Sequence, residues 1–108
     1  MKLNKEDLPP TDGEWDRDDL GKWHSMLNGQ THNSLGPAFI YDDGEKAWLV
    51  NGKLHRLDGP AVECADGRKK WYVDGRCIHK QDFTSTVISF LLGVDETTAK
   101  IIEKEFKP

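Results

Sequence analysis

The stretch of sequence that decides the fold is WLVNGKLHRLDGPA, residues 48–61. Its Gly-Pro-Ala at 59–61 repeats the Gly-Pro-Ala at 36–38, and its Trp48 and His55 are matched by Trp71 and His32. The positions in each pair are offset by the same period of 23. The Asn-Gly at 51–52 recurs with the same spacing, as Asn-Gly at 28–29 and Asp-Gly at 74–75. A fixed period of this length predicts a repeat architecture, here a tandem array of about two and a half units.

Turn signals divide each unit into short strands. Asn-Gly and Asp-Gly between apolar residues favour hairpin turns, because these residue types tolerate a positive φ. They predict hairpins that close near 43–44, 51–52, 66–67 and 74–75. Period-two alternation then predicts that one set of apolar side chains forms the core face of the sheet. That set is Phe39, Tyr41, Trp48, Val50, Val62, Cys64, Trp71 and Val73.

The last third of the chain changes to a helical pattern. Asp82 is placed to cap a helix with apolar residues at helical spacing over 83–92, and Gly93 is placed to end it. Asp95 is placed to cap a second helix. The apolar stripe of this helix is Ala99, Ile102 and Phe106. Because an open repeat sheet needs a cover, we expect the two helices to pack on its apolar face as a helical hairpin.

The 108 residues are therefore predicted to form a single α+β domain, with an antiparallel β-meander of roughly five to seven strands and a C-terminal two-helix cap. Residues 1–20, rich in Asp and Glu, are expected to be an acidic tail or an irregular cover. Residues 21–80 are the β-repeat region and residues 81–108 the helical cap. The sequence shows no signal or transmembrane segment, and Cys64 and Cys77 are expected to be reduced, which predicts a cytoplasmic protein.

Residues with catalytic chemistry are scarce. His32 and His55 recur one period apart, which favours a hydrogen-bonding strut over acid–base catalysis. Zinc is an alternative, but the four candidate ligands match no zinc motif in their spacing. These are Cys64, Cys77, His55 and His79. No nucleophile motif or phosphate-binding glycine loop is present either. We predict no enzymatic activity, no catalytic residue, no metal site and no cofactor.

Positions that differ between units point to a candidate partner-binding surface, because the scaffold does not dictate them. In the second unit, this candidate surface gathers basic and aromatic residues. They are Arg56, Arg68, Lys69, Lys70, Tyr72 and Arg76. The net charge is −4, but residues 45–80 carry eight bases against five acids. Arg and Tyr are typical anchors of interfaces, and the alternative is an ordinary solvated surface.

The repeat resembles the MORN-type hairpin repeat in its period of 23 and its Trp-x-x-Asn-Gly turn. The string from Trp48 to Ala61 is similar to a variant found in small, mostly uncharacterised phage and bacterial proteins. The resemblance covers residues 28–79. It departs from ordinary MORN repeats in having Gly-Pro-Ala in place of a Gly-x-Gly rhythm, so lipid binding is not carried over. It implies an elongated antiparallel meander, a phage context and no catalytic residue.

Three functions remain as hypotheses. The first is a phage-encoded, non-enzymatic interaction module that binds a host protein in the host cytoplasm and inhibits a host process such as antiviral defence. The second is a protein that sequesters a small anionic ligand or nucleotide on these basic residues, with a Trp or Tyr72 stacking on it. The third is DNA binding through residues 82–106, which the acidic character of that segment disfavours. No membrane partner is expected, and pairing of two copies through a sheet edge stays open.

Overall fold

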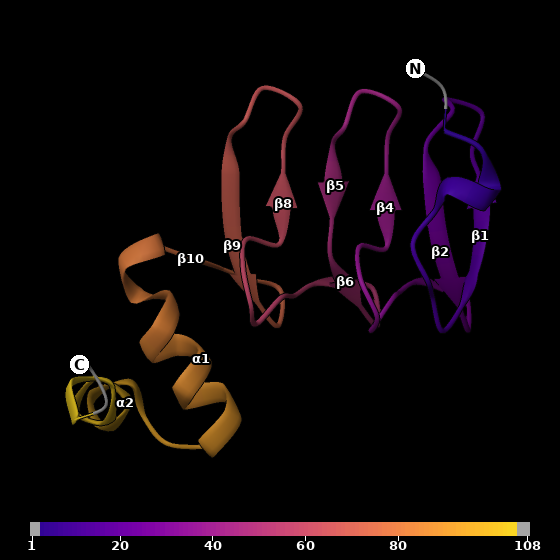
Figure 1. Ribbon diagram of the computed structural model, residues 1–108. Helices are drawn as coiled ribbons and strands as arrows, with labels where there is room; N and C mark the ends of the chain where they lie inside the picture. The colour runs from indigo at the N-terminus through magenta and orange to yellow at the C-terminus, as the bar shows by residue number, and fades with distance from the viewer. Residues whose placement is uncertain (1–2, 106–108) are drawn as a thin grey trace.

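The computed structural model describes residues 3–105 of the chain. Its elements run in the order η1 (Lys5–Asp7), β1 (Glu14–Arg17), β2 (Trp23–Leu27), β3 (Gln30–Thr31), β4 (Phe39–Ile40), β5 (Lys46–Ala47), β6 (Leu49–Val50), β7 (Lys53–Leu54), β8 (Val62–Glu63), β9 (Lys69–Val73), β10 (Arg76–Ile78), η2 (Lys80–Asp82), α1 (Phe83–Leu92) and α2 (Glu96–Glu105). The predicted fold class is confirmed, because an antiparallel meander is followed by a two-helix hairpin (Figure 1). The molecule is elongated, with extents of 46 × 31 × 21 Å.

The main sheet follows the chain with few departures. Its strand order is β1-β2-β4-β5-β8-β9-β10, β3 pairs with β2, and β6 and β7 form a separate two-stranded ladder. Figure 1 shows the hairpins β1–β2, β4–β5 and β8–β9 standing side by side. Residues 3–105 contain ten strands, more than the five to seven that we predicted. The difference arises because the strands are short and interrupted: Trp48 alone separates β5 from β6.

Two kinds of turn close the hairpins, at the positions that the sequence predicts. Asn28, Asn51 and Asp74 have φ of 52°, 51° and 51°, and a glycine with positive φ follows each of them. This is type I′ geometry, which Asn and Asp tolerate because their short polar side chains reach the left-handed region. In the turns at 43–44 and 66–67, the positive φ lies on the glycine alone, at 99° for Gly44 and 92° for Gly67. The array therefore alternates tight turns with longer ones.

Successive units are joined by equivalent backbone hydrogen bonds. The Gly52 N–H donates to the Thr31 carbonyl at 2.9 Å, and one period later the Gly75 N–H donates to the Leu54 carbonyl at 2.7 Å. The type I′ turns at Asn51 and Asp74 are thus each held by the hairpin of the preceding unit. The units stack through their backbones, so the array does not depend on large apolar side chains at every contact.

The buried core lies at the N-terminal end of the sheet. Trp15, Trp23 and Ile40 form its buried cluster, and the half-buried Leu3 and Leu8 pack against them. The segment up to residue 20, which we expected to be a tail or an irregular cover, contains the regular strand β1, and Figure 1 shows it folded against β2. This segment supplies Trp15 and both leucines, and is therefore integral to the core.

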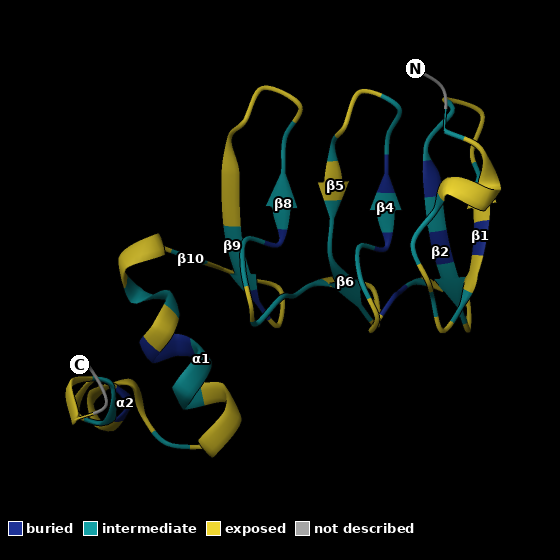
Figure 2. Cartoon of the chain, viewed as in Figure 1, coloured by how far each residue is buried: buried dark blue, intermediate teal, exposed yellow. Residues whose placement is uncertain are grey.

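The expected core face is only partly buried. Of its eight side chains, Val73 is buried and the other seven are half-buried. Ala38 and Ala61 are fully buried instead. The expectation was wrong because the hairpins β4–β5 and β8–β9 form a single layer, and α1 and α2 do not lie across its face (Figure 2).

The end of α1 and the start of α2 lie where the sequence predicts. Gly93 adopts a left-handed φ of 67° as the C-cap of α1, and Asp95 Oδ1 accepts the Thr98 N–H at 2.7 Å at the start of α2. Asp82 caps α1 differently than expected, because its main-chain carbonyl, and not its carboxylate, accepts bonds there. Its donors are the hydroxyls of Ser85 and Thr86. Phe106, expected on the apolar stripe of α2, lies outside the described residues.

The helical hairpin lies at the end of the array, beside β9 and β10, and not across the face of the sheet (Figure 1). The α1 helix packs on β9, and the Phe90 ring centroid lies 5.1 Å from that of His55. Leu91, Leu92 and Ile101 remain exposed. Among residues 3–105, no helix has both the length and the apolar character needed to cross a membrane.

Candidate functional site

Arg56, the first residue of the predicted partner-binding surface, is held by its own loop. Its side chain is only 20% exposed, and it donates to Asp58 Oδ1 at 2.8 Å, to the Pro60 carbonyl at 3.0 Å and to Glu63 Oε2 at 3.2 Å. Its guanidinium carbon lies 3.8 Å from the centroid of the Trp48 ring. Charge-assisted bonds and a stacked aromatic ring make this a stabilising clasp, with few donors left for a ligand.

The equivalent residue of the first unit makes a similar clasp. Asn33 Nδ2 donates to the Pro37 carbonyl at 2.9 Å, as Arg56 Nη1 does to the Pro60 carbonyl. The two side chains differ in length and charge, but both offer an N–H donor to the Gly-Pro-Ala segment that follows. Comparison of the units by residue type marked this position as variable and missed the shared contact.

Arg68 and Arg76 are exposed, and each is paired within the chain. Arg68 Nε lies 2.8 Å from Asp66 Oδ2, and Arg76 Nη2 lies 3.2 Å from Glu96 Oε1 on α2. Ion pairs this exposed are worth little, since water and salt screen them. A partner could therefore displace either carboxylate at small cost.

Lys69, Lys70 and Tyr72 lie on β9 but do not share one face. Successive side chains of a strand point to opposite faces, so Lys70 and Tyr72 face one way and Lys69 the other. Both lysines are exposed, and neither makes an ion pair within residues 3–105. Tyr72 is half-buried, and this burial raises the pKa of its hydroxyl, with a smaller contribution from the neighbouring Cys77 thiol. The structure thus divides the predicted residues between two faces and two loops.

An open groove that the sequence did not reveal lies between the loops of the first two units. It has a volume of about 620 Å³ and is lined by residues 33–36 and by residues of the segment from Trp48 to Asp58. Leu35 is 62% exposed there, and Trp48, Val50 and Leu57 are half-buried. His55, Arg56 and Asp58 add polar groups to the lining. We call this feature the inter-loop groove.

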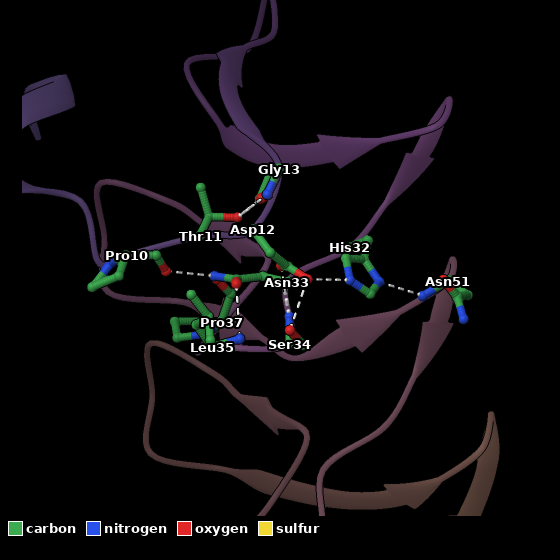
Figure 3. A network of polar contacts seen from close by, with 11 residues as sticks. Pro10, Thr11, Asp12, Gly13, His32, Asn33, Ser34, Leu35, Pro37 and Asn51 are labelled. Carbon is green, nitrogen blue, oxygen red and sulfur yellow. Dashed lines mark hydrogen bonds and ion pairs between the residues drawn. The ribbon is translucent and has the colours of Figure 1, made fainter.

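A network of polar contacts supports the loop at 33–36 (Figure 3). Asp12 Oδ2 accepts bonds from His32 Nε2 at 2.9 Å and from the Ser34 hydroxyl at 2.7 Å, and Asp12 Oδ1 accepts the Ser34 N–H at 3.0 Å. On the other side of its ring, His32 Nδ1 accepts the Asn51 N–H at 2.9 Å. Because Nδ1 is an acceptor, the ring proton sits on Nε2 and points at the carboxylate. The network ties the N-terminal segment to the turn of the second unit.

The prediction that both histidines serve as hydrogen-bonding struts is confirmed. His55 Nδ1 accepts the Asp74 N–H at 2.9 Å, which is the bond that His32 makes one unit earlier. The two rings differ on their Nε2 side. Asp12 bonds the ring of His32, whereas the ring of His55 packs against Phe90 and its Nε2 bonds no residue in the 3–105 range.

Removing the Asp12 carboxylate should reduce stability at neutral pH more than in acid. Bonds from the Ser34 side chain and backbone, and then from His32, hold the Asp12 pKa well below its ordinary value of 3.8. A lowered folded-state pKa contributes stability that is fully present above the unfolded pKa and is lost as the pH falls toward the folded pKa. We expect Asp12→Asn to be less stable than wild type at about pH 7, with a gap that narrows below about pH 4.

Urea denaturation followed by circular dichroism across this pH range measures the effect. Asp19→Asn is the matched control, because the exposed Asp19 makes no hydrogen bond or ion pair within the described chain. A gap between Asp12→Asn and wild type that stays constant with pH would show that the carboxylate charge adds nothing to the fold.

Nowhere in 3–105 do three or more His, Cys, Asp or Glu side chains gather in a way that could hold a metal ion. Cys64 and Cys77 are both free thiols. Comparison of the chain with protein-family models, with curated proteins and with solved structures gave no significant match.

Proposed function

We propose that this chain is a non-enzymatic protein-interaction module whose inter-loop groove receives apolar side chains of a partner protein. The observation that carries the proposal is the exposure of Leu35 beside the half-buried Trp48, Val50 and Leu57 in an open groove. Apolar surface of this kind gains about 25 cal/mol for each Å² that a partner removes from water. Aromatic side chains surrounded by polar groups are also typical of the centre of an interface.

The groove favours a protein partner over a small anionic ligand or nucleotide. Nε and Nη1 of Arg56 already serve Asp58, the Pro60 carbonyl and Glu63, which leaves only Nη2 to bind a phosphate. One face of the Trp48 ring is covered by the same guanidinium, so a base cannot stack on that face. A nucleotide needs an aromatic face for its base and free cationic donors for its phosphate, and these contacts reduce both.

In this proposal the partner is a host protein, and binding inhibits a host process such as antiviral defence by steric occlusion. The support for a phage context is the resemblance of residues 28–79 to the MORN-like variant of phage and bacterial proteins. Occlusion requires a rigid surface and no turnover, and the backbone bonds that link successive units supply such rigidity.

Leu35→Asp tests the groove, with Leu20→Asp as the matched control. Leu20 is 73% exposed and does not line the groove, so the same substitution there changes charge without changing the proposed surface. The immobilised chain and both variants are incubated with a lysate of a bacterial host, and retained proteins are identified by mass spectrometry. We expect one stoichiometric protein on wild type and Leu20→Asp, and roughly tenfold weaker binding to Leu35→Asp, because an ionised carboxylate is costly to bury.

Two outcomes would contradict the proposal. One is equal retention of the same protein by wild type and Leu35→Asp, which places the interface elsewhere. The other is retention of no protein by wild type even at low salt. Circular dichroism of each variant shows that a loss of binding is not a loss of fold.

A further inference from the structure

In the array, one strand of a repeat unit pairs along its edge with the strand that follows the Gly-Pro-Ala segment of the next unit. In the sheet, β4 follows β2, and β8 follows β5. The Ser25 N–H donates to the Ala38 carbonyl at 2.7 Å, and one period later the Trp48 N–H donates to the Ala61 carbonyl at 2.8 Å. Both alanines are 0% exposed, so only a small residue fits at that point of the joining strand.

β9 is the third strand at this position of the repeat, after β2 and β5, and in the described part of the chain no strand that follows a Gly-Pro-Ala segment pairs with its outer edge. A third Gly-Pro-Ala would stand one period after 59–61, at 82–84, where the chain reads Asp-Phe-Thr and begins α1. Residues Trp71–Val73 of β9 pair with β10. Lys69 and Lys70 pair with β8 on one side, and on the other side they meet no strand within residues 3–105. Figure 1 shows this part of β9 as an open outer edge of the sheet.

The backbone groups of Lys69 point out from this edge. The Cys64 N–H donates to the Arg68 carbonyl at 2.8 Å, so 64 and 68 form a hydrogen-bonded pair. Antiparallel ladders alternate bonded and non-bonded pairs. Glu63 and Lys69 are therefore a non-bonded pair, and the N–H and C=O of Lys69 face away from β8. One unit earlier, the equivalent Lys46 has Glu63 of the next strand as its neighbour on that side.

A second copy of the chain does not suit this edge. The opposite edge of the sheet is β1, where Asp16 Oδ1 occupies the outward Arg17 N–H at 3.1 Å. Pairing of β9 with a second β9 would bring Lys69 and Lys70 against like charges, which destabilises a strand pair. An acidic strand is therefore a better match for this lysine-bearing edge than a second β9.

From these observations we propose that the outer edge of β9 at Lys69 and Lys70 binds an extended acidic segment of a partner protein by strand addition. The segment continues the ladder as the missing next unit would, with a small residue where Ala38 and Ala61 lie in the array and a carboxylate beside Lys69. Main-chain bonds supply the affinity in this mode, and side chains supply the selectivity. This surface is separate from the inter-loop groove, so either can fail without the other.

The chain supplies its own probe, because residues 58–63, Asp-Gly-Pro-Ala-Val-Glu, fill the equivalent edge of β5. A capped peptide of that sequence is titrated into the full ¹⁵N-labelled chain, and amide shifts are followed by NMR. We expect saturable shifts centred on Lys69, at least about tenfold weaker binding of the peptide with Lys in place of its final Glu, and weaker binding at high salt.

Two variants separate charge from backbone. Lys69→Glu should weaken the acidic peptide at least about tenfold and improve binding of the Lys-ended peptide. Lys69→Pro should abolish both, because it removes the outward N–H while leaving the ladder to β8 intact. Leu35→Asp should bind the peptide as wild type does. Absence of saturable shifts at Lys69, or equal binding of the two peptides, would overturn the proposal and leave the lysines as guards against edge-to-edge aggregation.

Discussion

Replacing Trp23 with alanine should lower the free energy of unfolding by about 3–5 kcal/mol. Trp23 is 9% exposed and forms the core cluster with Trp15 and Ile40. Its Nε1 donates to the Leu3 carbonyl at 3.3 Å, so the ring also anchors the N-terminal segment over the sheet. Alanine would leave a cavity in this buried cluster and release this anchor. Small domains have only about 5–15 kcal/mol in total, so the variant should be close to unfolding at room temperature.

Urea denaturation followed by far-ultraviolet circular dichroism measures this loss without relying on tryptophan fluorescence. Leu35→Ala is the control, because its exposed side chain should cost less than about 0.5 kcal/mol. A loss below about 1 kcal/mol for Trp23→Ala would mean that the N-terminal cluster is not the main core of the molecule.

The position of this core is the part of the fold that the sequence did not predict. Local signals predicted the turns at Asn51 and Asp74 and the helix end at Gly93, because each depends on a few neighbouring residues. The contact of Trp15 with Trp23 depends on how the N-terminal segment folds back, which no repeat period specifies. Ser25 takes the repeat position of Trp48, and Trp23 lies two residues earlier on the same strand face. This phase difference was visible in the sequence, but its role in packing was not.

The residues of the candidate site, like the fold, were predicted only in part. The sequence placed Arg56 and Lys69 in one candidate surface without any information about contacts, although only Arg56 differs from its repeat equivalent, Asn33, whereas Lys69 is matched by Lys46. The structure gives them different roles, since Arg56 is clasped by its own loop and Lys69 has an open edge beside it. The residue type at Leu35 also differs between units, because the equivalent position of the second unit is Asp58. The groove on which it lies is formed by equivalent loops of two successive units, so only their stacking creates it.

Replacing His32 with alanine should cost about 2–3 kcal/mol, and His55→Ala only about 1 kcal/mol. Both variants lose the bond to the N–H of the following type I′ turn, at Asn51 or Asp74. His32 is 7% exposed and its bond to the Asn51 N–H is partly buried, so its removal opens a cavity beside that N–H, whereas His55 is half-buried, its bond to the Asp74 N–H is exposed and water can reach the vacated site. His32 additionally bonds Asp12, which holds the N-terminal segment in place.

The double variant Asp12→Asn/His32→Ala separates these causes. If the two side chains act through one network, the double variant should lose less stability than the sum of the single variants, since either change alone already breaks their shared bond. The pair Asp12→Asn/His55→Ala is the control and should be additive, because no described contact links those residues. All variants are compared by urea denaturation at about pH 7, where the Asp12 carboxylate is ionised. Equal losses for His32→Ala and His55→Ala would show that the turn bond alone sets the cost, and that the N-terminal segment is held by its tryptophan cluster without help from the histidine network.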